Sequence, residues 1–300
     1  MSISGRYITI RGGNVIGTPP IPLLLDLYPA TVAYSVRKLR TDYTGACIRV
    51  RRSIDNAEQD IGFVGNDLDT VSLLLFVGAG SGFVTIWYDQ MNTANAFQTS
   101  ASNQPLIVDN GNLIMQNSRP AVYTPGGKNI NTGLFTLPSF GDITLDFFAV
   151  LNNQSSDNPN HLLGLSNNNN NVDRSRVLFF GNDSSSTKSV RLYGGNIVYS
   201  SSDSGQLLFN TNYQGGGGAF QSRVNGNILS VNSFSNSGLN INQSSGFMLL
   251  SGRSASFPQL SYSNPFSIGY VQEFIPYLSD QSSNRTAIET NINNYYAIYP

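Results

Sequence analysis

The sequence is poor in the residues on which many enzymes, metal proteins and membrane proteins depend. Its 300 residues include one cysteine, one histidine and one tryptophan, and only 12% of the residues are charged. The single cysteine, Cys47, excludes a disulfide within the chain, and one Cys with one His cannot form a metal site from those ligands. No apolar run reaches the roughly 18–20 residues of a membrane-spanning helix, and the start lacks the pattern of a secretion signal. We therefore expect neither membrane insertion nor a signal peptide.

The few charges are balanced, and one stretch of the chain is enriched in them. The formal net charge of −1 gives no general field for attracting nucleic acid, so we expect no nucleic-acid partner. Residues 33–90 hold 13 of the 35 charged residues, with basic side chains such as Arg49 and Arg52 near acidic ones such as Asp55 and Asp60. This mixture favours salt bridges within one module.

Aromatic and small polar residues are abundant instead. The 17 Phe and 15 Tyr are enough for a large core, and Asn, Ser and Gly replace the missing charges. From Asn103 onward, short apolar runs are separated by Gly-Asn, Gly-Gly and Asn-Gly turns, and Asn225-Gly226 is a strong two-residue hairpin signal. The pattern predicts one large, mostly β domain over residues 23–300. We expect a concanavalin-like or jelly-roll antiparallel β-sandwich with a few short helices.

Individual elements are predicted from periodicity and capping signals. Apolar spacing predicts a helix within residues 23–39, and Asp67 is the expected N-cap of a second helix that ends at Gly78. A third helix is expected after Ser279, with Ile288 and Ile292 in its apolar stripe. Strands are expected at residues 46–52, 83–88, 105–108, 112–115, 120–123, 143–151, 176–180, 189–193, 196–199, 206–210, 218–224, 227–231, 247–250 and 266–277.

Three segments near the start resemble a known family. They are AYSVRKLRTDYTG (33–45), IRVRRS (48–53) and FVTIWYDQ (83–90). Together they resemble the opening of the catalytic β-sandwich of family 54 α-L-arabinofuranosidases, and still more the related modules in bacteriophage structural proteins. The closing segment, with its pattern G.VQE.I.Y followed by IE.NIN.YY.IY, resembles the end of concanavalin-like (laminin-G-like) sandwiches carried by phages. Both resemblances imply one sandwich.

The catalytic signature of the resembled enzymes is missing. Their nucleophile Glu lies in a segment like DLENGLF and their acid/base Asp in one like GIGGDNS. The counterparts in this chain, VLFFGNDSSS (177–186) and FMLLSGRSAS (247–256), lack that Glu and that Asp. Glycoside hydrolysis usually needs two converging carboxylates, so the sequence predicts no catalytic residues and a protein that is not an enzyme. A glycoside hydrolase or polysaccharide depolymerase of arabinofuranosidase type is the alternative.

Trp87, Tyr88, Asp89 and Gln90 are the candidate carbohydrate-binding residues, where an aromatic face could pack on a sugar while Asp and Gln contact hydroxyls. Because the strand before them is wholly apolar, the sequence favours the structural alternative, in which Trp87 is a core residue and Asp89 and Gln90 fix the following turn. No cofactor is expected, although NVDRS or GNDSS could supply oxygen ligands to Ca²⁺. His161, the lone histidine, is expected to be a hydrogen-bonded surface residue.

Residues 1–22 read as an extended N-terminal arm. Tyr7 to Ile10 could form one short strand before a proline-rich stretch interrupts it. The residues expected to dock on a neighbouring subunit are Tyr7, Ile8, Ile10, Pro19, Pro20 and Pro22. The phage resemblance then implies a structural protein of the virion: a capsid decoration, head-fibre or tail-associated protein. Its expected partners are other virion proteins, further copies of itself as a homo-oligomer, and host-surface glycans.

Overall fold

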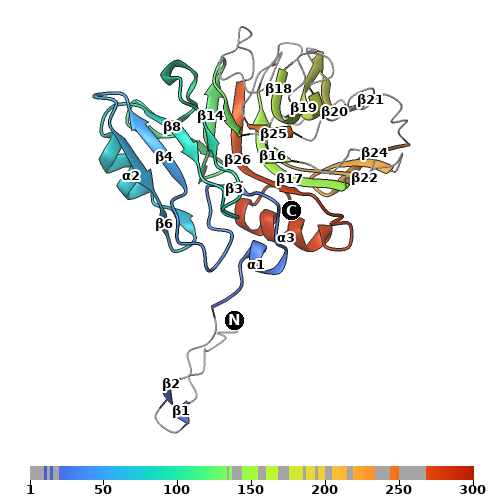
Figure 1. Cartoon of the computed structure of the whole chain (residues 1–300), viewed down its shortest axis with the longest axis horizontal. Coiled ribbons are helices and arrows are strands. Elements are labelled where there is room, and N and C mark those ends of the chain that lie inside the picture. Colours follow the sequence, from blue (N-terminus) through green and yellow to red (C-terminus); the bar gives the residue numbers. More distant parts are fainter. Residues whose placement is uncertain are drawn as a thin grey trace.

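Figure 1 shows the computed structural model of the chain. The structure describes residues 10–11, 14–15, 20–133, 135–136, 144–154, 160–167, 176–184, 187–192, 195–199, 205–214, 219–233, 244–249 and 268–300. Among these residues the fold is mostly β, with every strand pair antiparallel and a few short helices. The predicted fold class is confirmed.

The helices are α1 (Leu24–Leu27), α2 (Thr70–Val77) and α3 (Arg285–Tyr296), with a 3-10 turn at Ala101–Asn103. The strands of the first half are β1 (Ile10–Arg11), β2 (Asn14–Val15), β3 (Tyr34–Ser35), β4 (Ile48–Arg52), β5 (Glu58–Ile61), β6 (Phe63–Val64), β7 (Asp67–Leu68), β8 (Gly82–Trp87), β9 (Ala96–Phe97), β10 (Leu106–Asp109), β11 (Asn112–Leu113), β12 (Met115–Gln116), β13 (Arg119–Pro120), β14 (Val122–Pro125), β15 (Ile130–Thr132) and β16 (Phe135–Thr136). Those of the second half are β17 (Thr144–Asn153), β18 (Asn160–Asn167), β19 (Arg176–Ser184), β20 (Thr187–Leu192), β21 (Gly195–Tyr199), β22 (Leu207–Gln214), β23 (Ala219–Val224), β24 (Asn227–Ser233), β25 (Ser244–Leu249) and β26 (Ile268–Tyr277).

Most of these strands join into one large antiparallel sheet that folds into two layers. β17 lies between β22 and β26 and pairs with both over most of its length. β26 also pairs with β14 and with β3, which connects the end of the chain to its beginning. In Figure 1, β18, β19, β20 and β25 lie on one side of β17 and β22, and α3 lies on the other. The C-terminal helix therefore closes the base of the sandwich.

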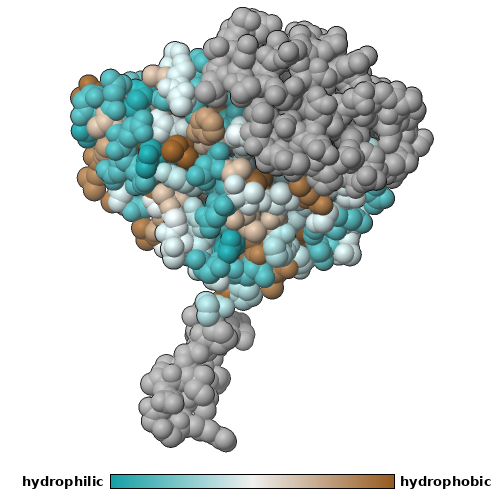
Figure 2. Space-filling model, in the orientation of Figure 1, coloured by the Kyte–Doolittle hydropathy of each residue, from teal (hydrophilic) through white to brown (hydrophobic). Residues whose placement is uncertain are grey.

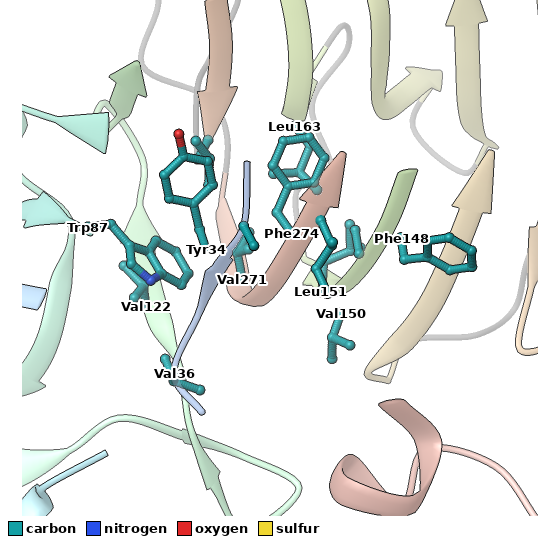
Figure 3. Close-up of a cluster of buried hydrophobic side chains, with 14 of the residues drawn as sticks. Tyr34, Val36, Trp87, Val122, Phe148, Val150, Leu151, Leu163, Val271 and Phe274 are labelled. Carbon is teal, nitrogen blue, oxygen red and sulfur yellow. The ribbon is translucent and has the colours of Figure 1, made fainter. Parts of the chain in front are cut away.

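The core joins strands that are far apart in the sequence. Trp87 of β8 and Tyr34 of β3 are fully buried and meet edge to face, with ring centroids 6.4 Å apart. Phe274 of β26 lies close by and extends the core toward Leu151 of β17 and Leu163 of β18 (Figure 3). Fully burying an aromatic or aliphatic side chain stabilises a fold by about 1.5–3 kcal/mol. The core thus depends on both halves of the chain.

The helix predicted within residues 23–39 is mostly wrong. Only Leu24–Leu27 is helical, and the chain then runs extended into β3, which pairs with Phe274 and Glu273 of β26. Every residue from 32 to 36 is fully buried. A segment that is buried on both faces is apolar at nearly every position, and such a run also satisfies a helical spacing.

The predicted N-cap of α2 is wrong by two residues. Asp69 caps the helix, and its carboxylate accepts hydrogen bonds from the backbone N–H and the hydroxyl of Ser72, at 2.9 and 2.6 Å. Asp67 lies instead in β7, where it accepts from Arg119 and from the hydroxyl of Tyr295. The hairpin of β6 and β7 occupies the position where the helix was expected to begin. The end of the helix at Gly78 is confirmed.

The outward side of α2 is apolar. Val71 and Leu75 are 68% and 79% exposed, and Ile54 and Val64 nearby are exposed as well. In Figure 2, hydrophilic residues cover most of the described part of the visible face; several hydrophobic ones lie at the edge that carries α2, and others are scattered over the middle and lower part. The inner side of α2 contributes Leu73 and Val77 to the core.

The C-terminal region follows the sequence closely. Asn225 and Gly226 have φ of 52° and 77° and join β23 to β24, which confirms the predicted hairpin. The final strand and helix are also confirmed, although α3 begins at Arg285, beyond the expected cap at Ser279. Ile288 and Ile292 are buried as predicted.

The N-terminal arm is described only in part. β1, which includes Ile10, pairs with β2 in a separate two-stranded sheet, and Pro20 and Pro22 are exposed. Three of the predicted docking residues lie outside the described residues: Tyr7, Ile8 and Pro19. The docking role therefore stays a prediction. Among the described residues, no helix is long and apolar enough to span a membrane.

Candidate functional site

A polar pocket of about 370 Å³ lies where β8 ends. Asp60 of β5 and Tyr88, directly after β8, form one wall. The turn that contains Tyr43 and Gly45 forms a second wall, and the loop of residues 92–95 forms a third. These three segments come together because β4 pairs with β5 on one side and with β8 on the other.

The first wall is organised around the carboxylate of Asp60. Arg49 binds it with two hydrogen bonds, Nε to Oδ1 at 2.7 Å and Nη2 to Oδ2 at 2.9 Å. The hydroxyl of Tyr88 donates to Oδ1 at 2.8 Å. The hydrogen bond from Arg49 lowers the pKa of Asp60, while burial and the bond to Asp60 raise the pKa of Tyr88 to about 12. At neutral pH the wall presents an ionised carboxylate and a neutral phenol.

The second wall depends on a glycine. Tyr43 is only 5% exposed, its hydroxyl donates to the carbonyl of Ala46 at 2.8 Å, and its ring meets Phe63 edge to face. A Cβ at Gly45 would lie 2.6 Å from the Tyr43 hydroxyl oxygen, closer than real contacts allow. Glycine is therefore required for the ring to lie at the pocket edge.

The third wall is shaped by one buried carboxylate. Oδ1 of Asp89 accepts from the backbone N–H groups of Ala33 and Met91 at 2.7 and 2.9 Å. Oδ2 accepts from those of Thr93 and Ala94 at 2.8 and 2.9 Å. Burial raises the pKa of Asp89, and these four hydrogen bonds oppose that shift. The loop is thereby held in a single shape before any ligand arrives.

The structure separates the four residues expected to bind carbohydrate. Trp87, Asp89 and Gln90 are all fully buried, and the side chain of Gln90 donates to the carbonyl of Arg37 at 2.7 Å. Only Tyr88 lines the pocket. The structural alternative makes Trp87 a core residue and lets Asp89 and Gln90 fix the turn. The positions of these three residues in the structure agree with that alternative.

Sequence reasoning missed Tyr43 and Asp60 as pocket residues. Their separations from Tyr88 along the chain do not predict that they lie near it, because only the pairing register of the strands brings them together. One clue was present: Arg49 is directly opposite Asp60 in the pairing of β4 with β5, and the mixed charges of this stretch had predicted such pairs. The ion pairs Arg40–Asp42, Arg49–Asp60 and Arg52–Asp55 confirm salt bridging within the module.

A second buried carboxyl lies on the α3 side of the sheet. Asp146 of β17 is 1% exposed and accepts from the side-chain amides of Asn210 and Asn212 at 2.7 and 2.9 Å. The backbone N–H of Gln281 also donates to it, at 3.2 Å. Burial raises the pKa of Asp146 to about 6, against the lowering effect of these hydrogen bonds. This carboxyl ties β22 and the segment before α3 to β17.

Asp146 should make stability depend on pH near neutrality. Its pKa in the folded protein lies above its ordinary value, so the stabilisation is present at low pH and is lost as pH rises through about 6. Between pH 5 and pH 8, the wild type should lose about 1–3 kcal/mol more unfolding free energy than an Asp146→Asn variant. Urea denaturation at both pH values measures this. An equal pH dependence in the two proteins would contradict it, and Asp42→Asn, at an exposed carboxylate with a lowered pKa, is the control.

Metal binding has no support among the described side chains. Within that part of the chain, no three His, Cys, Asp or Glu residues are grouped to hold a metal ion. The suggested Ca²⁺ loops, residues 171–175 and 181–185, and the side chain of His161 lie outside the described side chains. The calcium suggestion therefore stays a prediction.

Comparison with solved structures places the fold among known sandwiches. An arabinofuranosidase complexed with arabinofuranosyl-α-1,2-xylobiose matches with a TM-score of 0.65 and 16% identity, over 90% of this chain and 64% of that one. A family 54 α-L-arabinofuranosidase soaked with 4-nitrophenyl α-L-arabinofuranoside matches with a TM-score of 0.65, 17% identity and the same coverages. A Trypanosoma rangeli sialidase matches with a TM-score of 0.48 and 13% identity, over 69% of this chain and 31% of that one. No protein-family model and no curated protein matches the chain.

The chain therefore has a β-sandwich similar to the family 54 arabinofuranosidase domain and spans 64% of the length of those structures. This likeness contradicts the prediction that the protein is not an enzyme, because the structures that share its sandwich are glycoside hydrolases. That prediction rested on two segments, 177–186 and 247–256, in which Leu249 is the single described side chain. Missing motifs in those segments do not exclude hydrolysis on this fold.

Proposed function

We propose that this protein recognises carbohydrate. The observation that carries the proposal is the fold, which matches an arabinofuranosidase in complex with an oligosaccharide over 90% of this chain. The pocket adds support, because it combines two tyrosines, a carboxylate and an amide-rich loop in one concave site. Small polar groups convergent in a cleft with aromatic walls are typical of sites for small polar ligands.

A glycan array tests this proposal directly. The full chain should bind a subset of immobilised oligosaccharides, and the heat-denatured chain should bind none of them. Failure of the native chain to bind any oligosaccharide on a broad array would contradict the proposal.

Hydrolysis is the second candidate, favoured by the enzymes that share the fold. The assay follows release of 4-nitrophenol from 4-nitrophenyl α-L-arabinofuranoside and of arabinose from arabinofuranosyl-α-1,2-xylobiose. Turnover above the uncatalysed rate would establish an arabinofuranosidase or depolymerase, and alanine replacement of each Asp and Glu would then locate its carboxylates. Binding without turnover would leave recognition as the activity on these substrates.

The finer proposal concerns where recognition takes place. We propose that the chain is a structural component of a bacteriophage particle, held by its N-terminal arm and contacting host-surface glycans through the sandwich. The resemblance of residues 33–90 to phage modules supports it, together with the proline-rich arm.

Deleting residues 1–22 tests the role of the arm. We expect the full chain to form a homo-oligomer and the truncated chain to be a monomer with unchanged folding, because the buried core begins at Leu24. Sedimentation velocity measures the two states, and circular dichroism confirms that the truncated chain is folded. Retention of the full assembly by the truncated chain would contradict the docking role.

A further inference from the structure

We infer that the pocket bounded by Tyr43, Asp60, Tyr88 and the loop of residues 92–95 binds a neutral sugar residue and excludes acidic sugars. This inference rests on the proposed carbohydrate recognition and assigns both its location and its ligand class. It follows from the charge of the walls, the hydrogen-bonding groups left free, and the rigidity of the loop.

The charge of the pocket disfavours an anionic ligand. Asp60 is the ionised side chain in the lining, and no lysine or arginine is among the described lining residues. The guanidinium of Arg49, which contacts the lining at Asp60, already binds both carboxylate oxygens of that residue. A uronic or sialic acid carboxylate would therefore lose its hydration without finding a free cation to pair with, beside a carboxylate that can only accept hydrogen bonds, which raises the cost of binding.

The hydrogen-bonding groups of the lining that the protein leaves unused suit sugar hydroxyls, which both donate and accept hydrogen bonds. Oδ1 of Asp60 accepts two hydrogen bonds but Oδ2 accepts one, so one acceptor position is left on the carboxylate. Asn92 and Thr93 are exposed, and their side chains have no hydrogen-bond partner in the described part of the chain. Asn95 uses its carbonyl oxygen to accept from the backbone N–H of Asp89 at 3.0 Å, which leaves its amide N–H groups for a ligand. Neighbouring sugar hydroxyls can pair with such a carboxylate and such amides at once.

The loop is ordered in advance by contacts on its buried side. The four hydrogen bonds to Asp89 fix its backbone, and the hydroxyl of Tyr34 donates to the carbonyl of Ala94. A pocket that is already ordered loses little conformational entropy when a ligand binds. The volume of about 370 Å³ lies near the small end for ligand sites, which fits one sugar residue or a short glycan end.

A divalent cation is a poorer occupant of the same pocket. Hard cations such as Ca²⁺ take six to eight oxygen ligands, usually with several carboxylates. The lining offers the single carboxylate of Asp60, and Arg49 already neutralises it. The chemistry of the walls thus favours an uncharged polyhydroxyl ligand.

The test compares matched glycans and matched variants of the full chain. The array carries neutral oligosaccharides, including arabinofuranosyl-α-1,2-xylobiose and lactose, beside acidic counterparts such as glucuronosyl-xylobiose and 3′-sialyllactose. The neutral oligosaccharide that gives the strongest signal is then titrated calorimetrically. Tyr88→Ala, which removes a wall, should weaken its binding at least about tenfold.

Asn92→Gly offers a cleaner variant because Asn92 has φ of 59°, a conformation that glycine adopts without strain. It should weaken binding about threefold to tenfold and leave the Tm unchanged. Asn110→Gly is the matched control, since Asn110 is also exposed in a turn with φ of 47° but does not line the pocket. It should bind as the wild type does.

The outcomes separate this inference from the proposed function. Preference for neutral glycans, weakened by both pocket variants and retained by Asn110→Gly, supports the inference. Preference for the acidic counterparts, or neutral binding that neither pocket variant weakens, would overturn the pocket assignment while leaving carbohydrate recognition in place. Absence of binding to every glycan would contradict the proposed function itself.

Discussion

Replacing Glu273 with glutamine is expected to lower the free energy of unfolding by about 3–5 kcal/mol, because it leaves a buried charge unpaired. Glu273 of β26 is fully buried and Arg37 is 7% exposed. Arg37 binds both carboxylate oxygens, Nε to Oε2 at 2.7 Å and Nη2 to Oε1 at 2.9 Å. The hydroxyls of Ser35 and Tyr296 donate to Oε2 as well, at 2.6 and 3.3 Å. This one carboxylate therefore joins the segment around β3, the strand β26 and the helix α3.

Urea denaturation of wild type and variant measures the effect, and two further variants control it. Asp42→Asn breaks an exposed ion pair with Arg40 and should change stability little, since exposed pairs contribute little. The double variant Arg37→Met with Glu273→Leu removes both charges and should recover most of the loss. A Glu273→Gln protein as stable as the wild type would mean that the pair does not hold these elements together.

Replacing Asp89 with alanine should be comparably severe and should also abolish glycan binding at the pocket. The substitution removes the acceptor for four backbone N–H groups, and a buried donor without a partner costs about 1–3 kcal/mol. Because the freed loop can partly reach water, the expected loss is about 3–5 kcal/mol in total. Binding should disappear because the loop of residues 92–95 forms one wall of the pocket.

Asp89→Asn is the graded control for this prediction. The amide keeps one carbonyl oxygen, so it can accept from part of the four N–H groups, and an intermediate loss of stability is expected. Denaturation together with calorimetric titration of the preferred neutral glycan gives both readouts. Unchanged glycan binding by a folded Asp89→Ala protein would show that the loop does not shape the site.

Much of the fold could be predicted from the sequence, because turn residues and the periodic spacing of apolar residues are local signals. The hairpin at Asn225-Gly226 is set by two residues that tolerate positive φ, and the buried stripe of α3 by the spacing of Ile288 and Ile292. The segment of residues 32–36 shows why the helix predicted there is wrong: it is buried throughout, so its apolar pattern contains no periodicity that separates helix from strand.

Less of the candidate site could be predicted, because its residues become neighbours only through the pairing register of the strands. Tyr88 was recognised among four neighbouring residues, but local sequence does not say which of the four faces outward. Asp89 and Gln90 carry polar side chains of the kind expected in a sugar site, yet both are buried and bind backbone groups. Tyr43 and Asp60 join Tyr88 only once β4, β5 and β8 are paired.

The most direct measurement is a crystal structure of the full chain soaked with the neutral oligosaccharide that binds best on the array. We predict a sugar residue in the pocket, with hydroxyls bonded to Asp60 and to the Asn92–Asn95 loop and one face against Tyr88. A sugar bound at another surface, with the pocket empty, would contradict the account of this site.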